Sequence, residues 1–157
     1  MDFYEIIENT VIVSLFFKVF ALIILLIATI MDIREKKIPL SIPTVQMTLS
    51  GLCFIYLWSK GITQPADFLY SLIPGIVLLT VSYFTRQGIG LGDGLTVLAL
   101  GPLFGIMDTM LIVLISFTFS AVIGVILLIM KKVSGKSVMA FMPFLTVGVG
   151  VMSFAFR

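Results

Sequence analysis

Two aspartates, Asp32 and Asp93, lie at the ends of long apolar runs and could do chemistry as a pair. Asp32 directly follows the run ALIILLIATIM, and Asp93 lies in the glycine-rich stretch GIGLGDG, residues 88–94, directly before a second apolar run. Two carboxylates that meet in a low-dielectric site cannot both ionise, so one keeps a proton and the pair can act as acid and base together. We therefore expect Asp32 and Asp93 to be catalytic, with one of them taking a proton from water.

The chain offers little for other kinds of catalysis. Histidine is absent, and Cys53 is the one cysteine of the sequence. These counts exclude an internal disulfide or a thiolate cluster, and they argue against zinc or iron chemistry. We expect no cofactor and no metal-binding residues. The formal net charge of +2 is also too small to indicate nucleic acid as a partner.

The glycines beside Asp93 are expected to shape the site. Gly90 and Gly92 flank Leu91 just before the carboxylate. Without side chains, they allow another backbone to approach closely, either a neighbouring helix or an extended substrate peptide. A phosphate-binding loop is the competing interpretation of GIGLGDG. It fails because no Lys-Ser/Thr pair follows and because an acidic residue would repel phosphate.

Each aspartate also has a purely structural interpretation. An acidic residue next to an apolar run can cap a helix, and Asp32 could instead pair with Arg34 or Lys36 nearby in the sequence. One such residue would be unremarkable. Two on the same face of the molecule, one of them among glycines, favour a functional site.

The elements that must position these residues are predicted to be membrane-spanning helices. Hydrophobic residues make up 60% of the 157 residues and charged residues 11%, whereas a soluble domain is about a quarter charged. The fold class is therefore all-α, an integral membrane bundle in a single domain, residues 1–157. Six apolar runs approach the length of about 20 residues that a crossing requires: Val11–Met31, Pro43–Ser59, Phe68–Phe84, Gly94–Met107, Thr109–Met130 and Val138–Phe156. The fourth is short and could be re-entrant instead.

The basic residues predict how the bundle is oriented. Seven of the ten lysines and arginines fall in the first, third and fifth hydrophilic loops: Arg34, Lys36, Lys37, Arg86, Lys131, Lys132 and Lys136. By the positive-inside rule these loops are cytoplasmic and both termini lie on the extracytoplasmic side. Asp32 and Asp93 then share the cytoplasmic edge of the cell membrane, which is the inner membrane where there are two.

At these residues the sequence resembles the prepilin peptidases, a family of membrane aspartyl proteases. GLGD, residues 90–93, matches the GxGD signature of such enzymes, and MDIREKKIPL resembles the family pattern in which an Asp is followed by a basic stretch and Ile-Pro-Asn. FMPFLTVGVG, residues 141–150, resembles the Pro-Phe-Leu segment of the family's last span. The resemblance extends from the first span to the last.

The resemblance implies an aspartic endopeptidase that removes the leader from type IV pilin-like or related precursors on the cytoplasmic side. It implies Asp32 and Asp93 as the catalytic pair, Gly90 and Gly92 as site-shaping residues, and no nucleic acid or cofactor. Its partners would be the precursor, the lipid bilayer and other pilus-assembly membrane proteins. Pro39 would turn the chain out of the first loop, and Pro143 would kink the last span beside the site. For both prolines, ordinary helix punctuation is an alternative.

The sequence departs from the family pattern in three ways. Leu40 stands where the family usually has Asn, and Leu95 stands where many members have Lys two residues after the catalytic Asp. The paired CxxC motifs of the cytoplasmic methylase domain are absent, so the sequence resembles the short peptidase-only branch, without N-methylation. Two alternatives remain on the residues alone: a small proton- or cation-translocating membrane protein, and a structural subunit of a pilus or secretion assembly.

Overall fold

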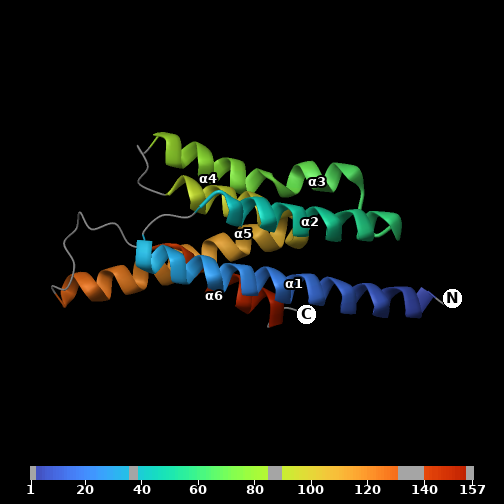
Figure 1. Cartoon of the computed structure of the whole chain (residues 1–157), viewed down its shortest axis with the longest axis horizontal. Helices are drawn as coiled ribbons and strands as arrows, with labels where there is room; N and C mark the ends of the chain where they lie inside the picture. Colours follow the sequence, from blue (N-terminus) through green and yellow to red (C-terminus); the bar gives the residue numbers. More distant parts are fainter. Residues whose placement is uncertain (1–2, 36–38, 85–89, 131–139, 155–157) are drawn as a thin grey trace.

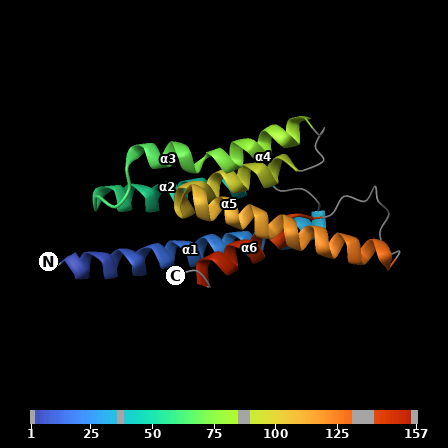
Figure 2. The ribbon, with the colours of Figure 1, turned by 180° about the vertical axis from the view of Figure 1, so that it is seen from behind.

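The computed structural model describes residues 3–35, 39–84, 90–130 and 140–154, and every regular element in these ranges is a helix. The all-α prediction is confirmed for the described residues. The elements are α1 (Phe3–Glu35), α2 (Ser41–Ser59), α3 (Pro65–Ser71), α4 (Ile73–Phe84), α5 (Leu91–Ile129) and α6 (Met142–Phe154). Figure 1 shows the helices lying side by side in an elongated bundle, and Figure 2 shows the same arrangement from behind.

The third apolar run, predicted as one helix over Phe68–Phe84, is two helices in the structure. α3 ends at Ser71, and α4 begins at Ile73 after a break at Leu72. Pro74 explains the break, because a proline has no N–H for a helical hydrogen bond and its ring clashes with the carbonyl four residues earlier. The new start at Ile73 places Pro74 in a first turn, where neither defect matters.

The fourth and fifth runs are joined in α5, but the helix is interrupted at Gly105. This residue has φ 78° and ψ 173°, whereas its neighbours are helical. A residue with a Cβ rarely adopts such a positive φ, so glycine is what permits the interruption. The predicted segments Gly94–Met107 and Thr109–Met130 therefore correspond to the two halves of one element that changes direction between them.

Contacts with α1 show which way the first half of α5 runs. The charge of Asp32 acts on Asp93 near the start of α5. Fourteen residues earlier in α1, Lys18 Nζ lies 5.0 Å from the centre of the Phe104 ring, just before the interruption. As the chain advances along α5 it thus moves backwards along α1. The first half of α5 is antiparallel to α1.

Contacts with α6 show that the second half of α5 runs the opposite way. α6 is antiparallel to α1, because Thr29 lies against Thr146 and Leu22 lies near Gly150. α6 is also antiparallel to the second half of α5, because Phe141 stacks near Phe117, at 5.0 Å between ring centres, and Gly148 lies against Ile112. The chain therefore reverses at Gly105, as both views of the yellow and orange parts of α5 show (Figures 1 and 2).

The first half of α5 is short for a membrane crossing. Residues 91–104 rise about 21 Å at 1.5 Å per residue, and the hydrocarbon core of a bilayer is about 30 Å thick. The re-entrant alternative for this segment consequently stays open. Three stretches of the described residues are long and apolar enough to cross a membrane: Asn9–Glu35, Pro65–Phe84 and Leu91–Ile129. The number of six crossings stays a prediction.

The outer surface of the bundle fits a lipid environment. Large apolar side chains are exposed along its length, among them Phe16 at 62%, Ile30 at 55% and Leu114 at 63%. A soluble protein rarely exposes so continuous an apolar surface. The protein is therefore a membrane protein.

One end of the bundle gathers the helix ends that adjoin the basic loops. The end of α1, the start of α2, the end of α4 and the starts of α5 and α6 all lie at the left in Figure 1. Most of the basic residues behind the orientation prediction lie outside the described residues: Lys36, Lys37, Arg86, Lys131, Lys132 and Lys136. Both aspartates lie at this same end.

Candidate active site

The inward face of α1 places Asp32. Ala21, Leu25 and Ala28 are fully buried and belong to the hydrophobic core of the bundle. Their spacing of four and then three residues follows one face of an α-helix, and a further step of four reaches Asp32. Asp32 is only 7% exposed. The carboxylate therefore ends an otherwise apolar stripe that faces the core.

The first half of α5 places Asp93 in the same manner. Val97, Leu100 and Phe104 are buried, and the same spacing counted backwards from Val97 leads to Asp93. Asp93 is 6% exposed. Gly90 is the N-cap residue of α5, so Asp93 lies in the first helical turn. Each aspartate is thus the polar end of an inward-facing stripe, one at the end of α1 and one at the start of α5.

The fold brings the two aspartates together. Asp32 lies near enough for its charge to act on the Asp93 carboxyl group. Both are buried, so little water screens this repulsion. Arg34, offered by the sequence as an alternative partner for Asp32, is exposed; Lys36 lies outside the described residues. A juxtaposed, buried carboxyl pair is the arrangement in which two acids share a proton.

The start of α6 holds the Asp32 carboxylate. The backbone N–H of Met142, the first residue of α6, donates a hydrogen bond to Asp32 Oδ2 at 3.2 Å, and this bond is buried. A carboxylate is stabilised at a helix N-terminus by the free N–H groups and by the helix dipole. Asp32 thereby caps α6 from another helix, so a structural role applies to this residue, and this role is compatible with the predicted catalytic one.

Pro143 explains why α6 presents one N–H to Asp32, and its predicted role needs correction. α6 begins at Met142, so Pro143 lies in the first turn and does not kink a continuing helix. A proline at this position has no N–H that needs a partner. The N–H groups of Phe144 and Leu145 bond to the Phe141 carbonyl at 3.0 and 3.1 Å. The Met142 N–H is left for Asp32.

Asp93 has a different environment from Asp32. The backbone of Gly90 hydrogen-bonds to the Asp93 carboxyl group, as an acidic residue in the first turn often bonds the N-cap backbone. Asp93 Oδ1 is buried and has no hydrogen-bond partner among the described residues. A buried oxygen without a partner is costly in a structural role alone. It is available to a group that enters the site.

Residues 19–125 match the type IV leader peptidase family. The chain belongs to this family. The matched range contains both Asp32 and Asp93, and it ends before α6. No curated protein and no solved structure matches the chain. Family membership makes the protein a protease and implies a pilin-like precursor as its substrate.

Pro39 and the two residues that depart from the family pattern, Leu40 and Leu95, lie at or near helix starts. Pro39 directly precedes α2, and its carbonyl accepts the Ile42 N–H at 3.1 Å. Leu40 is the N-cap residue of α2 and makes no side-chain capping bond; it is 68% exposed. Leu95 is half-buried in α5. None of these contacts involves a carboxyl group of the pair.

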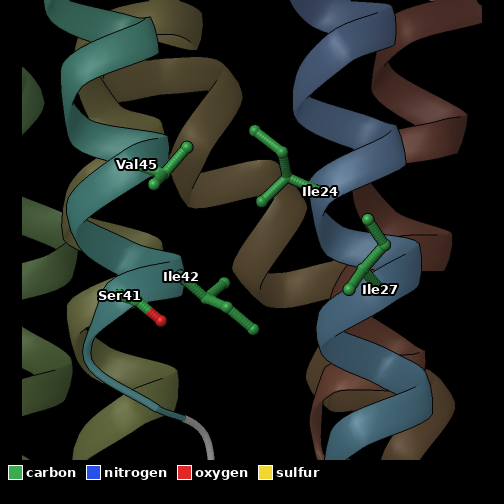
Figure 3. Close-up of a pocket in the computed structure, with 5 residues that line it drawn as sticks. All are labelled: Ile24, Ile27, Ser41, Ile42 and Val45. Atoms are coloured by element: carbon green, nitrogen blue, oxygen red, sulfur yellow. The ribbon is translucent and has the colours of Figure 1, made fainter.

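A pocket of about 200 Å³ lies between α1 and α2, lined by Ile24, Ile27, Ser41, Ile42 and Val45. Figure 3 shows Ile24 and Val45 facing each other across it, with the Ser41 hydroxyl beside Ile42. Among the residues that the structure describes, its lining includes no acidic or basic one. The pocket is thus an apolar gap on the bundle surface and is separate from the carboxyl pair.

Sequence reasoning missed the group that bonds Asp32 and a polar contact close to it. The group is the Met142 N–H, and the contact joins α1 to α6 through Thr29 and Thr146, whose hydroxyl oxygens are 2.8 Å apart. Pro143 was a usable signal, because a proline early in an apolar run marks a helix start. No short stretch of the sequence indicated that α1 and α6 would pack against each other.

Substitution of Gly90 tests whether it shapes the site. A Cβ at Gly90 would come within 2.9 Å of Asp93 Oδ2, so the carboxyl group would have to rotate. We expect Gly90→Ala to lower the cleavage rate by roughly tenfold, as expected from a small misplacement of a reacting group, with little change in thermal stability. Gly51→Ala is the matched control, since nothing lies within 4 Å of its Cβ position. Equal rates for the two variants would contradict a site-shaping role.

Proposed function

We propose that this protein is an aspartic endopeptidase of the GxGD type that removes the leader from a pilin-like precursor at the cytoplasmic face of the cell membrane. The observation that carries the proposal is the buried, juxtaposed pair of Asp32 and Asp93, reached from two different helices. The pair needs no metal or histidine, and the chain has no histidine. Membership of a leader peptidase family supports the same reaction.

The different environments of the two carboxyl groups support different roles. Asp32 accepts the Met142 N–H at the start of α6, which favours a negative charge there, so we assign it as the base. Asp93 would hold the shared proton. Its unpartnered Oδ1, when protonated, could donate to the scissile carbonyl oxygen of the substrate.

The reaction then proceeds by water addition. Asp32 takes a proton from water while the water oxygen attacks the scissile carbonyl carbon, and Asp93 gives its proton to the carbonyl oxygen. The resulting tetrahedral intermediate has two hydroxyl groups. Asp93, now ionised, takes back a proton from one hydroxyl, Asp32 gives its proton to the amide nitrogen, and the C–N bond breaks. The pair ends with one proton, as it began.

The position of the pair supports cleavage at the membrane edge. Both aspartates end apolar stripes at the end of the bundle where the basic loops attach. With those loops cytoplasmic, a multi-pass protein of the inner membrane would hold the pair at its cytoplasmic boundary. The alternative, a proton- or cation-translocating protein, would place its ionisable groups nearer the bilayer midplane. The family match does not favour that alternative.

The proposal is tested by cleavage of a pilin-like precursor with a basic leader, incubated with the purified protein in proteoliposomes. We expect one new N-terminus, identified by mass spectrometry, at the leader boundary. A precursor with substituted residues at the scissile bond should stay intact. If the precursor stays intact with the inserted protein but is cut by another member of the family, leader peptidase activity on that precursor is ruled out.

A further inference from the structure

Polar contacts join α1 to α6 at two successive depths. At the membrane edge the Met142 N–H donates to Asp32 Oδ2 at 3.2 Å. One turn deeper, the hydroxyl oxygens of Thr29 and Thr146 are 2.8 Å apart. Thr29 precedes Asp32 by three residues and Thr146 follows Met142 by four, so each pair of residues lies on one face of its antiparallel helix.

Thr146 is the centre of the deeper contact. It is 8% exposed, and its Oγ1 also lies 2.9 Å from the Met142 carbonyl oxygen and 3.3 Å from the Leu25 carbonyl oxygen. A hydroxyl has one proton to donate and two lone pairs to accept. When Thr146 donates to either carbonyl, Thr29 donates to Thr146, so every O–H has an acceptor.

The rest of the described contact between α1 and α6 is made largely by apolar side chains of one core cluster. The buried residues around Thr146 on α6 are apolar, including Leu145 and Val149. In a membrane the hydrophobic effect does not drive helices together, so their register depends on van der Waals packing and on polar contacts between them. The Asp32–Met142 bond is already long at 3.2 Å. A small slide of α6 would break it.

We propose that Thr29 and Thr146 are positioning residues for the catalytic aspartate: their hydroxyl contact sets the register of α1 and α6 and thereby keeps Asp32 at the start of α6. This inference rests on the proposed function, because it assumes that Asp32 is the base. Thr146 lies outside the residues that match the family, 19–125. Neither hydroxyl needs to touch the substrate.

The test compares Thr146→Val, which keeps the shape and removes the hydroxyl, with Thr146→Ser, which keeps the hydroxyl. We expect Thr146→Val to lower kcat by roughly 10- to 100-fold, as a misplaced reacting group does, with KM nearly unchanged. Thr146→Ser should stay within a few-fold of wild type. Thr118→Val is the matched control, because Thr118 is exposed and its hydroxyl donates a hydrogen bond within its own helix, to the Leu114 carbonyl at 2.8 Å.

Thr29→Val removes the same hydroxyl contact from the α1 side. We expect it to lower kcat in the same direction as Thr146→Val, and the double variant should lose little more than Thr146→Val alone, because Thr146→Val already removes the contact between Thr29 and Thr146. If Thr146→Val does not accumulate in the membrane, Thr29→Val, at a half-buried position, decides the question.

Three results would overturn the inference: full kcat in the valine variants, equal losses in Thr146→Ser and Thr146→Val, or losses that add in the double variant. The assay includes Asp32→Asn. If Asp32→Asn is inactive while Thr146→Val is normal, the positioning role alone is wrong. If Asp32→Asn cleaves the precursor normally, the proposed catalytic pair is wrong, and the positioning role is overturned with it.

Discussion

Replacing either aspartate with asparagine is expected to lower precursor cleavage by roughly 10²–10⁴-fold, the usual contribution of a positioned acid or base. Asparagine is the informative change because it keeps an acceptor oxygen. At position 32 that oxygen can still receive the Met142 N–H, and at position 93 it can still receive the Gly90 backbone bond. Both caps therefore survive, while the shared proton is lost. The measurement is the cleavage rate of Asp32→Asn and Asp93→Asn in proteoliposomes.

Asp108→Asn is the control for this pair of substitutions. Asp108 is half-buried in the second half of α5, beyond the interruption at Gly105 and away from the carboxyl pair. We expect its cleavage rate to equal that of the wild type. A rate above a tenth of wild type in either Asp32→Asn or Asp93→Asn would show that the two carboxyl groups do not act as one catalytic unit. The cleavage would then need another acid and base.

Gly101→Ala is expected to destabilise the protein by about 1–3 kcal/mol, the range for overpacking a core, and to reduce cleavage as well. A Cβ at Gly101 would collide with the backbone carbonyl of Ser71, and one at Gly75 would collide with the backbone of Leu98. Because backbone atoms cannot rotate away as a side chain can, Gly101→Ala would force the end of α3 away from the half of α5 that carries Asp93. Thermal unfolding in detergent measures the loss.

Gly51→Ala separates this clash from the general effect of adding a methyl group to a helical glycine. Gly51 lies in α2, with nothing within 4 Å of its Cβ position. Alanine is favoured over glycine within a helix by up to about 1 kcal/mol, so we expect Gly51→Ala to be as stable as the wild type or slightly more stable. Equal stability of Gly101→Ala and Gly51→Ala would contradict the close packing of α3 on α5.

The candidate pair could be predicted because its signals are local. Asp32 and Asp93 stand out by residue type, by their place at the ends of apolar runs and by the glycines beside Asp93. The inward stripes that end at the two residues follow helical periodicity, which side-chain direction along one helix dictates. Prolines are local signals too, but the effect of a proline depends on where its helix begins. Pro143 was expected to kink the last span, whereas it lies in the first turn of α6.

The sequence by itself determined that this chain is a helical membrane protein with two acidic residues where apolar helices end, since composition and periodicity are properties of each segment alone. The tertiary structure decided that α5 reverses at Gly105, that α6 lies along α1, and that the Met142 N–H bonds Asp32 while Thr146 lies against Thr29. In lipid, an apolar helix face can pack against several different apolar helices with similar stability. The choice of neighbours therefore depends on a few close backbone approaches and hydroxyl contacts between residues far apart in the chain.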